Sequence, residues 1–184
     1  MELDRFEWLE SRVEEAIDPK QRIIDPHHHL WDRGGSTYLA PQLSADTRAS
    51  HNVTHTVFVE CMSKYDRRAM ESLQPVGETA LVADEAVKMD KAGGATIEGI
   101  VGFADLMLGD ACEDVLAAHE QAGAGLFRGI RYATAWSSDP VIGIAHTNPS
   151  EGLLSDATFR KGARKLSSMG YSFDAWKRYS GWKK

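Results

Sequence analysis

The sequence lacks the features that mark secreted, membrane-bound and nucleic-acid-binding proteins. Its two cysteines, Cys61 and Cys112, stand far apart, so neither a disulfide framework nor a structural zinc site is expected. No apolar run is long enough to cross a bilayer, and the opening MELDRFEWLE has neither region of a signal peptide. The net charge of −6 offers no basic surface to nucleic acid or to an anionic membrane. We therefore expect a cytoplasmic protein with a small-molecule partner, and the sequence leaves open whether it forms a homo-oligomer.

Apolar residues make up 42% of the chain, which is enough for a core of ordinary size. Segments rich in β-branched and aromatic residues alternate with segments of helical periodicity. Strands are expected at 22–31, 55–62, 96–106, 124–133 and 170–176, and helices at 78–91, 110–122 and 158–169. This order is typical of a parallel sheet, either open and doubly wound or closed into a (β/α)8 barrel. No strand ends in a nucleotide-binding glycine loop, which weighs against Rossmann and P-loop folds.

The chain divides into three expected parts. An N-terminal helical extension is predicted for residues 1–20, because apolar residues fall on one helical face: Leu3, Phe6, Leu9, Val13 and Ile17. An α/β domain of the barrel type follows at 21–176, and a divergent tail covers 177–184. A complete barrel needs about 250 residues. With five expected strands, the chain is predicted to hold about the first five βα units and to stop before the barrel closes.

Three consecutive histidines, His27 to His29, follow the apolar start of the first expected strand. Side chains alternate along a strand, so His27 and His29 should share one face while His28 occupies the other. Two imidazoles at this spacing can bind one divalent metal ion, each through a neutral ring nitrogen. Asp25 would share the face of His27 and orient it. The alternative is a cluster of exposed or backbone-bonded histidines; the buried strand before them favours the metal site, since barrel active sites lie at strand ends.

The segment RIIDPHHHLWD resembles the first strand of the amidohydrolase-related group of the amidohydrolase superfamily, where a D-x-H-x-H-x-W signature opens a (β/α)8 barrel. The matching residues are Asp25, His27, His29 and Trp31. VFVECMSKY, IVGFADL, FRGIRY and SFDAW resemble the same group in the same order, so the resemblance runs from about Ile23 to Trp176. It implies a TIM-barrel hydrolase of small carbonyl compounds such as lactones and amides. It also implies that His27 and His29 are catalytic and bind a divalent metal ion, often zinc, although some lactonase relatives work without one.

FRGIRY contributes Arg128 and Arg131, and arginines of this region hold the substrate carboxylate in lactonase-like relatives. Arginine presents a rigid fork that suits carboxylates. The two lie three positions apart and so face opposite ways on an ideal strand. Arg131, nearer the end of the strand, is therefore the first candidate for substrate binding and Arg128 the second. Asp174 in SFDAW is either a further pocket residue or an ordinary polar residue at a strand end.

Other polar residues near strand ends are assigned structural roles. Rim or capping positions are expected for Glu60, Cys61, Ser63 and Asp105. His51, His55 and His119 lack partners at ligand spacing and are expected to be structural. The long segment 133–154 is typical of an active-site lid, from which Trp136 and His146 would reach the substrate or remain exposed.

The resemblance places further site residues, a histidine on the sixth strand and an aspartate on the eighth, beyond the five strands expected here. The end of the chain, KRYSGWKK, does not continue in that pattern. Five strands would leave an exposed sheet edge, and two histidines without a third ligand would hold a metal weakly. We therefore expect little or no hydrolase activity from the chain alone. The alternatives are an inactive truncated paralogue and a decarboxylase-type lyase that uses the same histidines.

Overall fold

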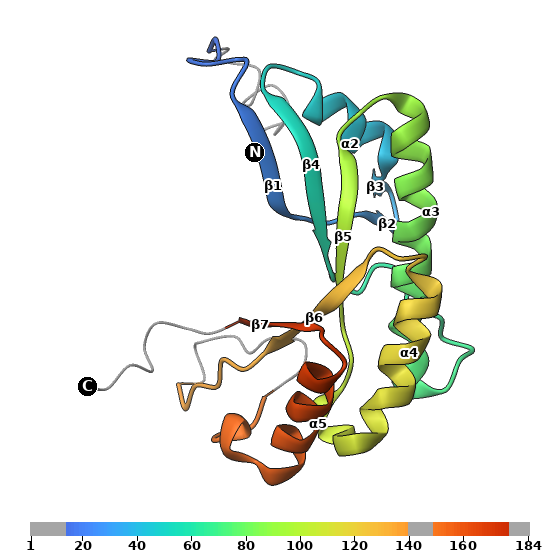
Figure 1. The fold of residues 1–184 in the computed structure, drawn as a ribbon, viewed down its shortest axis with the longest axis vertical. Helices are drawn as coiled ribbons and strands as arrows, with labels where there is room; N and C mark the ends of the chain where they lie inside the picture. The colour runs from blue at the N-terminus through green and yellow to red at the C-terminus, as the bar shows by residue number, and fades with distance from the viewer. Residues whose placement is uncertain (1–13, 140–148, 177–184) are drawn as a thin grey trace.

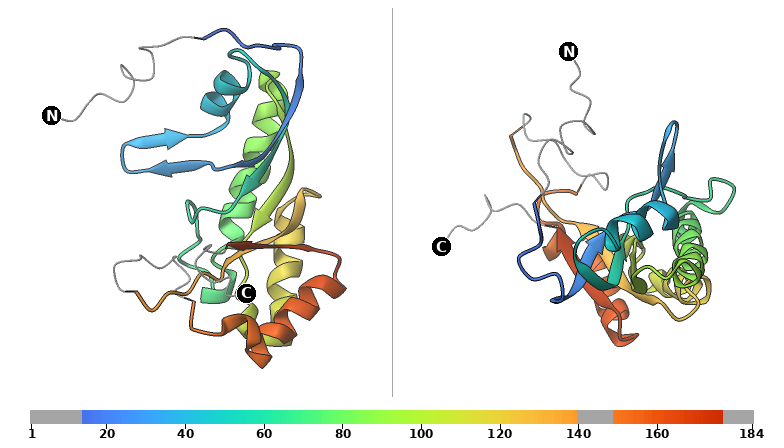
Figure 2. Two further views of the ribbon diagram at one scale, coloured as in Figure 1. Left: turned by 90° about the vertical axis from the view of Figure 1, so that its left-hand side faces the viewer. Right: turned by 90° about the horizontal axis from the view of Figure 1, so that it is seen from above.

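The computed structural model describes residues 14–139 and 149–176. Their main feature is a five-stranded, wholly parallel sheet in the order β1-β4-β5-β6-β7. The strands are β1 (Arg22–His28), β4 (Asn52–Val59), β5 (Thr96–Gly102), β6 (Phe127–Ala133) and β7 (Ser172–Trp176). The sheet curls into a half-barrel (Figures 1 and 2). Because each strand lies beside the next one in the sequence, the sheet has no point at which the order reverses, unlike a doubly wound sheet.

Four helices accompany the sheet in the described residues: α2 (Ala40–Thr47), α3 (Val76–Ala92), α4 (Cys112–Ala122) and α5 (Ala157–Ser168). The described residues also contain three short 3-10 helices: η1 (Glu71–Leu73), η2 (Leu106–Ala111) and η3 (Leu153–Ser155). In Figure 1 the long helices α3 and α4 lie along one side of the sheet, which we call the outer face. The opposite, concave side is the inner face. None of the described helices combines the length and the apolar character needed to cross a membrane.

The core lies between the outer face and the helices, in two clusters. One contains Phe58 of β4 and Met89 of α3, and the other contains Ile130 of β6 and Phe159 of α5. Ile24 of β1, on the inner face, is in contrast 56% exposed. Both clusters thus lie on the outer face. The inner face holds apolar as well as polar side chains, because Val59 and Val101 pair in register one position beyond the outer-facing Phe58 and Ile100.

The structure confirms all five expected strands and the three expected helices, with shifts of a few residues at their ends. Gly93, predicted to close the first long helix, caps α3 with a left-handed φ of 70°. The half-barrel agrees with the coarse expectation of a parallel α/β fold.

One expectation about local structure was wrong, and one element had not been expected. The N-terminal helix does not include residues 14–17, where Ile17 is fully exposed; a short segment whose apolar side chain is not buried gains too little to stay helical. The rest of that helix, like the tail at 177–184, lies outside the described residues. The residues between the first two expected strands were assigned no secondary structure, but they form an antiparallel hairpin, β2 (Trp31–Arg33) and β3 (Ser36–Tyr38), followed by α2.

Candidate metal centre

A bulge at the end of β1 determines where its histidines point. Asp25 pairs with Thr56 and His28 with Phe58, so β1 has one more residue than β4 in this interval. Pro26 falls in the interval, and proline is found at bulges because it has no N–H to give to the ladder. The bulge corrects the predicted position of Asp25, which lies in register on the face of His28 rather than that of His27. Its carboxylate accepts a hydrogen bond of 3.0 Å from the backbone N–H of His27, so it orients the main chain and not the imidazole.

His27 and His29 meet through their Nε2 atoms, which are 3.3 Å apart. Their rings are perpendicular, with centroids 4.9 Å apart. The Nδ1 of His29 is 2.7 Å from the carbonyl oxygen of Val59. Since a carbonyl can only accept, Nδ1 of His29 carries the proton and its Nε2 presents a lone pair toward His27. The backbone of β4 therefore fixes both the ring orientation and the tautomer of His29.

This geometry fits two corners of a tetrahedral zinc site. Two Zn–N bonds of about 2.0–2.1 Å at the tetrahedral angle place their nitrogens roughly 3.3 Å apart, the spacing of these Nε2 atoms. Burial, followed by electrostatic interactions with His29 and Arg131, lowers the pKa of His27 and favours the neutral imidazole that a metal requires. In residues 14–139 and 149–176, however, no group of three or more histidine, cysteine or acidic side chains is arranged to hold a metal.

His28 is separated from the pair, as strand alternation predicted. It is buried on the outer face, where its ring packs edge-on against Phe58 and Nε2 lies 3.1 Å from the hydroxyl oxygen of Thr56. Burial lowers the pKa of His28 to about 4. His28 is thus a neutral core residue at physiological pH, although it adjoins both candidate ligands in the sequence.

Glu60 and Arg131 form a buried ion pair on the site side of the sheet. The Nε of Arg131 donates to Oε1 of Glu60 over 2.9 Å, and Nη2 donates to the Glu60 backbone carbonyl over 2.6 Å. Glu60 is only 1% exposed. The expected rim role for Glu60 was therefore wrong, because a carboxylate this deeply buried needs a cation beside it. In the sequence, Glu60 is a charged residue after the apolar run VFV, but nothing there indicates that Arg131, 71 positions later, is its partner.

The other two expected substrate residues lie in different places. Arg128, near the start of β6, donates to the backbone carbonyls of Gly125 and Phe127, and its stem packs over Gly99. The structure therefore does not bring Arg128 to the histidine pair at the strand ends. Asp174 pairs in register with Arg131, and its charge acts to raise the pKa of His27. Asp174, Arg131 and His27 thus form one electrostatic group.

Several residues predicted to be structural have such roles. Asp105 accepts hydrogen bonds from the backbone N–H of Met107, as the cap of η2, and from the Tyr132 hydroxyl. His119 is fully buried between the Thr79 hydroxyl and the Phe103 carbonyl. The backbone N–H groups of Cys61 and Ser63 both donate to Glu78 of α3, a contact that the sequence did not suggest. Trp136 is 40% exposed, while His146 lies outside the described residues.

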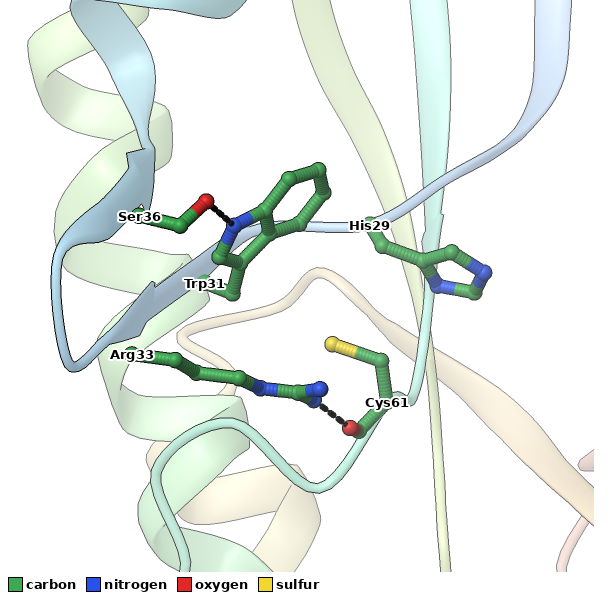
Figure 3. Close-up of a pocket in the computed structure, with 5 residues that line it drawn as sticks. All are labelled: His29, Trp31, Arg33, Ser36 and Cys61. Atoms are coloured by element: carbon green, nitrogen blue, oxygen red, sulfur yellow. Dashed lines mark hydrogen bonds between the residues drawn. The ribbon is translucent and has the colours of Figure 1, made fainter. Parts of the chain in front are cut away.

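A cavity of about 330 Å³ adjoins His29 (Figure 3). It is lined by His29, by Trp31, Arg33 and Ser36 of the hairpin, and by Cys61 after β4. No protein-family model, curated protein or solved structure matches this chain. Its function is therefore inferred from the site's geometry and from the resemblance described above.

Proposed function

We propose that this chain is a metal-dependent hydrolase of small carbonyl compounds, built as part of a TIM-type barrel of the amidohydrolase kind, with His27 and His29 as metal ligands. The observation that carries the proposal is the 3.3 Å spacing of the two Nε2 atoms at the end of a parallel strand. Both the parallel half-barrel and the D-x-H-x-H-x-W resemblance support it, because barrel active sites lie at the carboxyl ends of the strands.

The roles of the residues follow from their contacts. His27 and His29 would bind the ion through Nε2, with His29 held in the correct tautomer by the Val59 carbonyl. When bound, the ion would acidify a water molecule and polarise the substrate carbonyl. Arg131 has two of its nitrogens on Glu60, so Nη1 is the one with which it would donate to the substrate. Asp174, its neighbour in register, would accept a hydrogen bond from the substrate.

Zinc titration of the full chain, freed of metal by a chelator, tests the metal site. We expect one zinc ion to bind per chain by calorimetry, and either His27→Ala or His29→Ala to weaken binding by more than about tenfold. The matched control is His51→Ala, which removes an exposed histidine bonded to Ser50. Because residues 14–139 and 149–176 offer no third ligand beside the two histidines, the affinity should be lower than that of a four-ligand site. Zinc binding that is unchanged in both variants would contradict the proposal.

Hydrolysis of lactone and amide panels, with added zinc or manganese, tests the reaction itself. We expect any turnover to be slow, to require the metal, and to be lost in His27→Ala but not in His51→Ala. Zinc binding without turnover of any substrate would favour the non-catalytic alternative. Release of carbon dioxide from carboxylic substrates, without hydrolysis, would favour the lyase.

A further inference from the structure

The cavity beside His29 combines an apolar wall with a cationic residue, Arg33. Trp31 forms an apolar wall, and its orientation is fixed on two sides: Nε1 donates to the Ser36 hydroxyl over 3.0 Å, and the indole stacks on Tyr38 with centroids 5.0 Å apart. Figure 3 shows Trp31 and Arg33 on one side of the cavity and Cys61 facing them. Burial raises the pKa of the Cys61 thiol to about 11, so the thiol is uncharged at neutral pH.

Arg33 is the charged residue of this cavity, and none of the five lining residues is acidic. Its Nη2 donates to the Cys61 backbone carbonyl, which holds the guanidinium across the opening. Within residues 14–139 and 149–176, no acidic side chain pairs with Arg33. Its neighbour Asp32 instead accepts from the Thr37 hydroxyl across the hairpin. The remaining N–H groups of Arg33 are therefore available to an anion.

This distinguishes Arg33 from Arg131. Arg131 is already neutralised by Glu60, to which two of its nitrogens donate hydrogen bonds. A carboxylate that approached Arg131 would meet that buried negative charge nearby. One that approached Arg33 would meet a guanidinium that no described acidic side chain neutralises, beside a flat apolar wall. Planar, two-pronged recognition of a carboxylate is the interaction to which arginine is best suited.

We propose that the hairpin cavity binds a small carboxylate with a flat apolar body, which lies along Trp31 while the carboxylate pairs with Arg33. The volume of about 330 Å³ is at the small end of ligand pockets and suits a single ring with a short acidic arm. His29 stands at the edge of the same cavity. If the proposed hydrolase function also holds, on which this last step rests, the substrates are carbonyl compounds that carry a second, carboxylate group.

Phenylacetate is the probe, and phenylacetamide is its uncharged counterpart of nearly the same shape. The Trp31 indole N–H signal of the ¹⁵N-labelled full chain, assigned with Trp31→Phe, reports binding by NMR. We expect phenylacetate to shift this signal saturably. Phenylacetamide should bind at least about tenfold more weakly than phenylacetate, because it cannot form a charge-assisted pair with Arg33. This comparison uses the unaltered protein, so it does not depend on how a variant folds.

Arg33→Gln should weaken phenylacetate binding by about tenfold and leave phenylacetamide binding nearly unchanged. The matched control is Arg160→Gln on the exposed side of α5, which should change neither. A Trp31 signal that does not respond, or equal binding of phenylacetate to Arg33→Gln and to the unaltered chain, would overturn the proposal.

The same titration on His27→Ala, in the presence of a chelator, separates this site from the metal site. Phenylacetate binding should persist there, because neither Trp31 nor Arg33 depends on a metal. If it persists while zinc binding and hydrolysis fail, the cavity proposal stands and the hydrolase proposal falls. Suppose instead that hydrolysis occurs, but that Arg33→Gln turns over carboxylate-bearing and neutral substrates as the unaltered chain does. The hydrolase proposal then stands and the cavity proposal falls.

Discussion

Histidines on the outer and inner sides of the sheet lie in opposite environments. His28 and His119 on the outer side are buried, packed against Phe58 and Phe127, and have pKa values lowered to about 4. His27 and His29, at the inner strand ends, meet each other and are more exposed. The difference teaches that what surrounds a histidine, rather than its place in a run of histidines, decides whether it maintains the fold or is available to a ligand.

The comparison extends to the rest of each face. The outer face is closely packed: a Cβ at Gly162 of α5 would lie 2.4 Å from the Leu106 carbonyl oxygen. The inner face holds the ion pair of Glu60 and Arg131 and the exposed Ile24. Changes on the outer face should therefore affect mainly stability, and changes at the inner strand ends should affect mainly binding.

The largest expected effect is the loss of stability in acid. His28 and His119 have an ordinary pKa of 6.5 when unfolded and about 4 when folded. As the pH falls below 6.5, the unfolded chain takes up protons that the folded chain cannot. The free energy of unfolding should therefore fall between pH 6.5 and 4, by roughly 3 kcal/mol for each histidine at most, and level off below.

Urea denaturation at pH 7, 5.5 and 4.5 measures this loss. His119→Gln removes the titrating group and keeps a polar side chain, so the variant should lose less stability between pH 7 and 4.5 than the unaltered chain does. An equal loss in both would show that His119 does not contribute to the acid sensitivity.

The next largest effect is expected for His119→Ala. The change removes a stacked ring and leaves the Thr79 hydroxyl and Phe103 carbonyl without their buried partner. We expect a loss of about 3 kcal/mol in the free energy of unfolding, measured by urea denaturation at pH 7. His51→Ala serves as the matched surface control. A loss below about 1 kcal/mol would mean that the outer face relaxes around the cavity.

Gly162→Ala tests the close approach of α5 to η2. In an open helix this change is stabilising by about 1 kcal/mol. Here the added methyl group would press on the Leu106 backbone, so we expect a loss of about 2 kcal/mol in thermal or urea unfolding. Ser167→Ala, on the exposed side of the same helix, should leave stability nearly unchanged. A stabilised Gly162→Ala protein would contradict the packing described above.

His27→Ala should have the smallest effect on stability. The side chain is exposed, and its ring contact is with His29 rather than with the core. The free energy of unfolding without metal should change by less than about 0.5 kcal/mol, while zinc binding is lost. A large destabilisation would instead place His27 among the structural histidines and remove the contrast between the two faces.

Much of the fold was predictable because its strands and helices have clear periodicities. The hairpin was missed although it had a signal: Gly34 and Gly35 stand between WDR and STY, and both have positive φ values, 34° and 103°, as two-residue hairpin turns require. The separation of His28 from His27 and His29 followed from strand alternation. The position of Asp25 did not, because a bulge adds one residue and reverses the faces beyond it.

The sequence by itself determined the parallel order of strands and helices and the pair of histidines that could act together, since both depend on local periodicity. Only the tertiary structure decided which charges would meet. Glu60 and Arg131 are 71 positions apart and become an ion pair through the packing of β4 and β6 around β5. The same packing neutralises Arg131, whereas Arg33, beside Trp31, has no acidic partner among residues 14–139 and 149–176. Such pairings depend on distances in the folded sheet, and no spacing along the chain encodes them.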